Sequence, residues 1–166
     1  VYNAEDERLK RSVAMKFLKD PLLDEHRRLF EREAKAVAAL GKHPNIVQIH
    51  AWGEYAGQAY MVFEYLSASA YDLLKKRPEG LPVSEALSIA ADAADALHYA
   101  HRQGILHRDI KPGNILVDEE MARAKLADFG LARFREAGES SIMSGRIAGS
   151  IPYMSPEQTR GEELDE

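Results

Sequence analysis

Cysteine is absent from this chain of 166 residues, and no long uninterrupted apolar segment occurs in it. Without cysteine the chain forms neither disulfides nor a cysteine-ligated zinc site, and its composition suits a reducing cytosol. A membrane-spanning helix needs about 18 or more consecutive apolar residues. The most apolar segment, residues 86–100, is interrupted by Asp92 and Asp95. We therefore expect a cytoplasmic location and no membrane contact from this segment, while leaving open that a longer parent protein is anchored elsewhere.

An excess of basic charge is also lacking. The formal net charge is −5, so the chain has no overall positive field with which to hold nucleic acid. Hydrophobic residues make up 45% of the chain and charged residues 30%, which is typical of a folded globular domain rather than of a disordered segment. We therefore predict a globular domain without a nucleic-acid partner.

The first 66 residues predict a small lobe in which a β-sheet is combined with one helix. Apolar residues recur at helical spacing from about residue 22 to 40, and Gly41 follows as a natural C-terminal stop. The predicted strands are residues 13–18, 46–52 and 59–66, with a turn at 53–57.

The remaining residues, 67–166, predict a mainly helical lobe. Ser84 is expected to cap a long helix that ends near Gln103, just before Gly104. Short strands are expected at residues 115–117 and 125–127. The residues expected to form the buried stripe of the long helix are Ala86, Ala90, Ala93, Leu97 and Ala100. We interpret residues 1–66 and 67–166 as two lobes of one α+β catalytic unit.

The most informative motif is the run from His107 to Asn114, which reads His-Arg-Asp-Ile-Lys-Pro-Gly-Asn. It is followed, nineteen residues after Asp109, by Asp-Phe-Gly beginning at Asp128. Transfer of the γ-phosphoryl group of Mg-ATP needs a carboxylate that orients and deprotonates the attacking hydroxyl, a cation near the phosphate, and oxygen ligands for the metal. Asp109, Lys111, Asn114 and Asp128 supply these groups in turn. Two unrelated polar loops are the alternative, but the eight-residue run at this spacing favours phosphoryl transfer.

These motifs resemble the catalytic and metal-binding loops of the eukaryotic-type protein kinases, and the resemblance covers essentially the whole chain. Lys111 matches the Ser/Thr type of that family, and the segment from Gly149 to Gln158 is most similar to the bacterial eukaryote-like Ser/Thr kinases. The resemblance implies a two-lobe protein-kinase-like fold, with a small antiparallel β-sheet lobe and a mainly helical lobe. It also implies that ATP and Mg²⁺ are the cofactors and that serine or threonine hydroxyls of proteins are the acceptors.

Lys16 ends the run Val-Ala-Met-Lys, which resembles the strand that carries the ATP-anchoring lysine of that family. Glu33 lies four residues from both Leu29 and Val37, on the apolar face of the predicted helix, where an unpaired carboxylate is costly. An ion pair between Lys16 and Glu33 would satisfy both charges and leave Lys16 to hold the α- and β-phosphates. The alternative is two separate, solvent-exposed charges.

The resemblance also implies an adenine site and a stack of side chains that links the lobes. Phe63 takes the gatekeeper position, and the backbone of the following hinge, from Glu64 to Leu66, would bind adenine. The positions implied to sandwich the adenine ring are Val1, Ala14 and Leu116. The positions implied to form the stack are Val37, Ile49, His107 and Phe129, and His107 is expected to act there as a packing residue.

Arg108 resembles the arginine of kinases that are switched by phosphorylation of the activation loop. A phosphate adds a charge of about −1.5 to −2, which can pair with an arginine and order a segment. The candidate acceptors are Ser140, Ser141 and Ser144, and the alternative is a loop that is merely polar. Ser150 matches the serine or threonine that contacts the catalytic aspartate and lysine in Ser/Thr kinases. Ser155 begins the Ser-Pro-Glu segment, at a position where the family usually has alanine.

The resemblance stops short of the family's catalytic domain at both ends. The Gly-rich loop that covers the phosphates would precede Val1, and helices of the large lobe would follow the Ser-Pro-Glu segment. We therefore expect a fragment of a longer kinase that is marginally stable and essentially inactive as it stands.

Two other functions stay open at this point. Truncation favours a non-catalytic, pseudokinase-like scaffold, although such proteins usually lose Lys16, Asp109 or Asp128, and all three are present. A small-molecule kinase of the aminoglycoside type shares the order of Asp, Asn and Asp but generally lacks a segment like residues 149–157. Both comparisons favour a kinase that acts on proteins.

Overall fold

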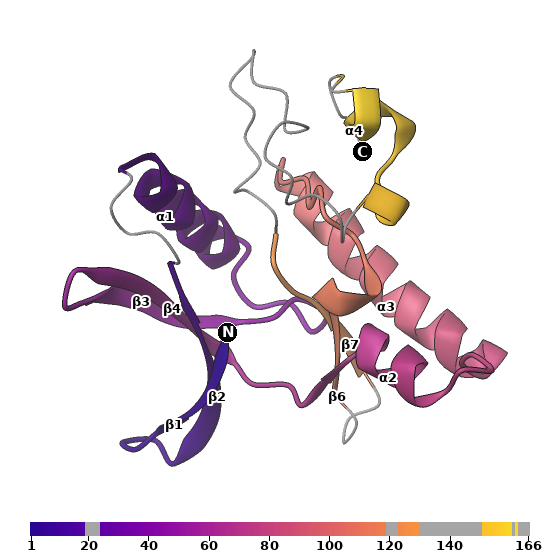
Figure 1. The fold of residues 1–166 in the computed structure, drawn as a ribbon, viewed down its shortest axis with the longest axis horizontal. Helices are drawn as coiled ribbons and strands as arrows, with labels where there is room; N and C mark the ends of the chain where they lie inside the picture. Colours follow the sequence, from indigo (N-terminus) through magenta and orange to yellow (C-terminus); the bar gives the residue numbers. More distant parts are fainter. Residues whose placement is uncertain (19–23, 119–122, 130–150, 161, 163–166) are drawn as a thin grey trace.

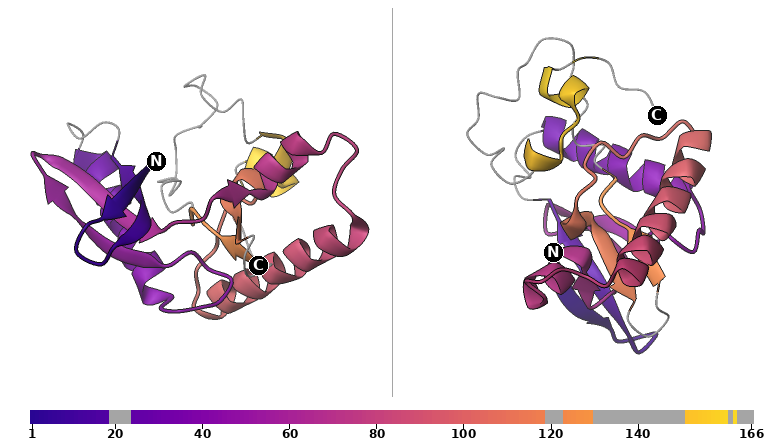
Figure 2. Two further views of the ribbon diagram at one scale, coloured as in Figure 1. Left: turned by 90° about the horizontal axis from the view of Figure 1, so that it is seen from below. Right: turned by 90° about the vertical axis from the view of Figure 1, so that its right-hand side faces the viewer.

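A computed structural model describes residues 1–18, 24–118, 123–129, 151–160 and 162 of the chain, while the side chains of Glu33 and several other residues in helix α1 lie outside the described part. Two antiparallel sheets organise the molecule (Figure 1). In the left view of Figure 2, the larger sheet and α1 lie at one end of the molecule, whereas α2 and α3 lie at the other end.

The larger sheet has the strand order β1-β2-β4-β3. Its strands are β1 Tyr2–Asp6, β2 Arg11–Phe17, β3 Ile49–Tyr55 and β4 Gln58–Glu64. Asp6 closes the β1–β2 turn, because its Oδ1 accepts hydrogen bonds at 3.1 Å from the backbone N–H groups of both Arg8 and Leu9. The register of β2 against β4 places Lys16 opposite Met61.

The β3–β4 turn is shorter than the sequence suggested. Ala56 and Gly57 both have positive φ, 51° and 78°, which is the two-residue turn whose twist matches that of the flanking strands. The turn predicted at residues 53–57 was therefore too long. Gly53 lies inside β3, where a Cβ atom would meet the hydroxyl of Tyr60 at 3.0 Å. The close approach of Tyr60, and not a turn, explains why glycine occupies position 53.

Helix α1, Asp24–Ala39, covers one face of the larger sheet (Figure 1). Phe30 and Ala34 are buried against Ala59 and Met61 of β4. The helix ends as predicted before Gly41, which has a φ of +64°. The amphipathic pattern read from the sequence therefore corresponds to burial against this sheet.

The smaller sheet has the order β5-β6-β7. Its strands are β5 Ala68–Ser69, β6 Ile115–Asp118 and β7 Arg123–Leu126. Helix α2, Ala70–Lys76, follows β5 directly, and Ser69 and Asp72 form a capping box at its start. Sequence reasoning missed β5 and α2, because a strand of two residues carries almost no periodic signal.

Helix α3, Val83–Arg102, corrects two expectations. Pro82 is its N-cap and makes no side-chain cap, so the prediction of Ser84 was wrong. Its buried residues are Ala93, Ala96 and Ala100, whereas Ala86 and Ala90 are exposed. The reason is that the C-terminal half of α3 packs against Leu40 and Leu126, in a cluster that also holds Val37, Ile46 and Phe129. No helix in the described ranges combines the length and the apolar run needed to cross a membrane.

The segment after α1 connects the two sheets. The Asn45 side chain donates to the carbonyl of Ala124 at 2.9 Å, and the backbone carbonyl of Asn45 accepts from the N–H of Leu126 at 2.8 Å. The N–H of Val47 then donates to the carbonyl of Leu126 at 2.9 Å. Residues predicted as the start of a strand at 46–52 therefore run along β7, and β3 begins only at Ile49.

Candidate active site

The two loops that carry the predicted catalytic residues lie side by side. One precedes β6 and contains the short 3-10 helix Pro112–Asn114, and the other follows β7. Ile115 and Leu126 are paired in the register of these antiparallel strands, so the start of β6 adjoins the end of β7. The N–H of Ala127 donates to the carbonyl of Asn114 at 2.8 Å, which ties the loops together. One hairpin thus brings residues 109 and 128 into the same region.

Asp109 is held by the other residues of its own motif. Its Oδ2 accepts from Lys111 Nζ at 2.6 Å and from Asn114 Nδ2 at 3.1 Å, and its backbone carbonyl accepts from Asn114 Nδ2 at 2.7 Å. Asn114 is buried, with 6% of its surface exposed. Because Nδ2 faces Asp109, the amide oxygen of Asn114 is directed away from that carboxylate. The structure therefore brings together the predicted base, cation and one metal ligand.

Lys16 reaches this region from the larger sheet. Its Nζ lies 2.8 Å from Oδ1 of Asp128, although the two residues are 112 positions apart in the sequence. The predicted ion pair between Lys16 and Glu33 stays a prediction, because the side chain of Glu33 lies outside the described residues. The contact with Asp128 was missed by sequence reasoning, since no local pattern reports which distant carboxylate a strand lysine meets.

Two residues of the site have strained backbone conformations. Arg108 has a φ of +66° and Asp128 a φ of +55°. Residues other than glycine adopt this left-handed conformation rarely, and each instance costs on the order of 1–3 kcal/mol. The surrounding contacts must hold both residues in place. Such strain gathers at functional sites, and here it lies within and next to the predicted catalytic groups.

His107 contacts both loops. The backbone N–H of Asp109 donates to Nδ1 of His107 at 3.3 Å, so the hydrogen of the ring is on Nε2, which lies 2.9 Å from the carbonyl of Ala127. The ring is buried and its centroid lies 4.8 Å from that of Phe129. Burial lowers the pKa of His107 below its ordinary value of 6.5, which favours this neutral form. The expected packing role beside Phe129 is confirmed.

The carboxylate of Glu64, at the end of β4, contacts both the segment before β3 and strand β7. Its Oε1 accepts from the backbone N–H of Gln48 at 2.7 Å, and its Oε2 lies 2.6 Å from Nζ of Lys125 on β7. Both side chains are largely buried, with 23% of Glu64 and 17% of Lys125 exposed. Sequence reasoning assigned only the backbone of Glu64 to a function. A lysine directly between Ala124 and Leu126 was the signal that could have indicated a buried partner.

The positions implied for adenine stay predictions, and the structure describes the burial of each. Ala14 on β2 faces Phe63 on β4 in the register, and both are half-buried. Leu116 on β6 and Leu66 after β4 are half-buried as well. Val1 is 79% exposed at the end of the chain. Of the implied inter-lobe stack, Val37 and Phe129 are buried in one cluster, and Ile49 packs against it.

The proposed regulatory serines cannot be placed. Ser140, Ser141, Ser144 and Ser150 lie outside the described residues. Arg108 is described and its side chain is half-buried.

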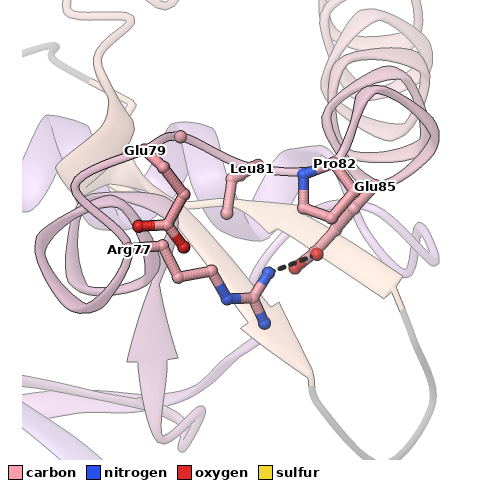
Figure 3. A pocket seen from close by; sticks show the side chains of 6 residues that line it. Arg77, Glu79, Leu81, Pro82 and Glu85 are labelled. Atoms are coloured by element: carbon pink, nitrogen blue, oxygen red, sulfur yellow. Dashed lines mark hydrogen bonds and ion pairs between the residues drawn. The ribbon is translucent and has the colours of Figure 1, made fainter.

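A separate hollow of about 550 Å³ lies in the connection between α2 and α3 (Figure 3). An ion pair between Arg77 and Glu85 spans it, and Glu79, Leu81 and Pro82 complete its wall. None of these residues belongs to the predicted catalytic set, so the hollow is distinct from the site. Within the described ranges, no three His, Asp or Glu side chains gather as a metal site.

Comparison with known proteins agrees with this geometry. The family model described as "Protein kinase domain" matches residues 1–166. The chain is 40% identical to serine/threonine-protein kinase PknF of Mycobacterium tuberculosis and 37% identical to PknB of Mycobacterium leprae, and each match covers 99% of this chain. The chain spans only 36% and 27% of the lengths of these relatives.

A solved structure is also similar. The crystal structure of a double mutant of the PknI kinase domain of Mycobacterium tuberculosis superimposes with a TM-score of 0.74 at 33% identity. The superposition covers 99% of this chain and 62% of that one.

Proposed function

The chain belongs to the protein kinase domain family, and on that premise we propose that it is the catalytic core of a protein serine/threonine kinase. The reaction is transfer of the γ-phosphoryl group of Mg-ATP to serine or threonine hydroxyls of proteins. The observation that carries the proposal is the convergence of Asp109, Lys111 and Asn114 with Asp128 of the neighbouring loop, which Lys16 contacts from the larger sheet. Residues 1–66 and 67–166 would act as two lobes of one unit, in the cytoplasm.

Each polar residue then has a chemical task. Asp109 orients the attacking hydroxyl and accepts its proton, a contribution that is typically worth about 10²–10⁴ in rate. Lys111, which already touches the Asp109 carboxylate, offsets charge on the γ-phosphate. Lys16 holds the α- and β-phosphates, and Glu33 is proposed to brace it. Lys16 thus exchanges part of its contact with Asp128 for phosphate oxygens.

The donor set fits a magnesium ion. Mg²⁺ is usually bound by one or two carboxylates together with substrate phosphates and water, so the lack of a larger acidic cluster among the described residues agrees with this chemistry. Asp128 offers a carboxylate that is 46% exposed, and Asn114 directs its amide oxygen away from Asp109. When bound, the ion neutralises negative charge on the phosphates.

The nucleotide and regulatory positions complete the proposal. The backbone from Glu64 to Leu66 would bind adenine, with Val1, Ala14 and Leu116 against the ring. A phosphate on Ser140, Ser141 or Ser144 would pair with Arg108, and Ser150 would contact Asp109 and Lys111.

The test is a phosphotransfer assay on the natural protein that carries this chain. With labelled ATP and a mixture of serine- and threonine-containing proteins, we expect transfer to hydroxyl side chains. Asp109→Asn keeps the shape of the side chain but removes the base, so transfer should become undetectable while nucleotide binding persists. Thr159→Ala, at an exposed residue outside the site, is the control and should transfer normally. Normal transfer by Asp109→Asn would reject the assignment.

A further inference from the structure

Helix α4, Pro156–Arg160, begins with a reciprocal pair of hydrogen bonds. The backbone N–H of Ser155 donates to Oε1 of Gln158 at 3.0 Å, and the backbone N–H of Gln158 donates to Oγ of Ser155 at 3.2 Å. This is a capping box, and Pro156 occupies the first helical position, where proline is favoured. The serine that departs from the usual alanine at this position therefore has a structural task, because alanine has no hydroxyl with which to close the box.

The same glutamine reaches the catalytic loop. Nε2 of Gln158 donates to the backbone carbonyl of Arg108 at 2.6 Å, across fifty residues of sequence. Both ends of the amide are thus engaged. Its oxygen faces the N–H of Ser155 and its nitrogen faces a carbonyl, so only one of the two amide orientations satisfies both contacts.

The carbonyl that receives this bond belongs to the peptide unit between Arg108 and Asp109. The N–H of the same peptide unit, from Asp109, donates to Nδ1 of His107. The peptide plane that precedes the proposed base is therefore held on one side by His107 and on the other by Gln158. Arg108 has a φ of +66°, a conformation that persists only where neighbouring contacts impose it.

We propose that Gln158 is a positioning residue for Asp109, and this proposal rests on the kinase function proposed above. The capping box keeps the Gln158 side chain extended, and the amide nitrogen then keeps the strained Arg108–Asp109 peptide in the orientation that presents the Asp109 carboxylate to Lys111 and Asn114. The position of α4 and the orientation of the Asp109 carboxylate are therefore coupled. Any change that displaces α4 would disturb Asp109 without touching the nucleotide contacts of Lys16.

The sharpest variant is Gln158→Glu. Glutamate has the same shape and still accepts from the N–H of Ser155, so the capping box and α4 stay intact. It replaces the amide donor of residue 158 with an oxygen that faces the carbonyl oxygen of Arg108. Thr159→Ala is the matched control on the same helix, because its hydroxyl donates to the carbonyl of Pro156 within α4 itself.

Hydrogen exchange followed by mass spectrometry on the natural protein measures the contact directly. We expect peptides spanning residues 105–116 to exchange about tenfold faster in Gln158→Glu, which corresponds to about 1.4 kcal/mol, and to be unchanged in Thr159→Ala. In kinetics, kcat should fall by about the same factor while the Kd for ATP stays constant. Should Gln158→Glu fail to fold, Gln158→Met removes the same donor without adding charge, together with the acceptor of the Ser155 N–H, and must give at least the same increase in exchange.

Unchanged exchange in these peptides, or an equal increase in Thr159→Ala, would overturn the proposal. So would a kcat that does not change in Gln158→Glu. If the unsubstituted protein transferred no phosphate, the proposed kinase function would fail, but the exchange comparison would still decide whether Gln158 holds the peptide.

Discussion

Removing Lys125 should destabilise the junction between the two sheets by a predictable amount. Lys125→Met keeps the aliphatic length of the side chain but leaves the Glu64 carboxylate with the Gln48 N–H as its remaining partner among the contacts described above. Only 23% of Glu64 is exposed, so water can compensate for the lost ammonium group only in part. The consequence is a charged group that the folded state solvates poorly.

The size of the effect lies between two known limits. Exposed ion pairs contribute about 0.2–1 kcal/mol, and breaking a fully buried pair costs about 3–5 kcal/mol. For a pair with about a fifth of each side chain exposed, we expect a loss of about 1.5 kcal/mol in the free energy of unfolding. In a domain of this size that corresponds to a fall in Tm of about 3–6 °C.

A double-mutant cycle tests the reasoning. Glu64→Gln, Lys125→Met and the double variant are melted under identical conditions by circular dichroism. Because removal of both charges leaves no uncompensated group, the double variant should be more stable than the sum of the single effects predicts, by about 1 kcal/mol. Arg160→Met, at a side chain that is 55% exposed, should change Tm little. Strictly additive effects of Glu64→Gln and Lys125→Met would refute the proposed coupling between these two charges.

Two further predictions concern acid sensitivity and a turn. Burial lowers the pKa of His107 in the folded state below its ordinary value of 6.5, which applies in the unfolded chain. Above pH 6.5 the neutral ring contributes fully to the stability of the folded protein. As the pH falls below that value, the unfolded chain binds a proton that the folded state binds less readily, so the free energy of unfolding decreases. Tm should therefore decline more steeply between about pH 6.5 and 5.5 in the unsubstituted protein than in His107→Phe, and parallel curves would contradict the assignment. Gly57→Ala places a side chain at a φ of +78° and should cost about 1 kcal/mol. Gly113→Ala, where a Cβ meets nothing within 4 Å, is its control, and equal melting shifts would show that strain at residue 57 is not the cause.

Much of the fold was readable from local patterns. The helix over residues 24–39 follows from apolar spacing and a glycine stop, and strands β2 and β4 follow from β-favouring runs. Strand β1 was not predicted, and β3 begins three residues later than the predicted strand at 46–52. The errors have local causes as well. Ser84 carried the composition of an N-cap, but Pro82 already begins the helix. The alanines at 86 and 90 share the pattern of the buried stripe, yet the residues of α3 that the cluster around Leu40 and Leu126 buries are Ala96 and Ala100.

The catalytic motif was identifiable because its members are close in sequence and their chemistry is specific. Asp109, Lys111 and Asn114 touch one another within six residues, so one loop conformation brings them together. Sequence reasoning also placed His107 beside Phe129, and the rings do meet. The fold therefore brings the residues of the predicted motif together around Asp109, and their catalytic roles stay predictions.

Contacts between distant residues were decided by tertiary structure alone. Lys16 meets Asp128 across 112 positions, Lys125 meets Glu64 across 61, and Gln158 meets Arg108 across 50. The physical reason is one of range. Preferences for turns, helix caps and periodic burial depend on residues that are close in the sequence, so they can be read from the sequence. The packing of two sheets and a helix decides which carboxylate or carbonyl a long side chain reaches. Many sequences with the same local patterns would surround the same motif with different partners.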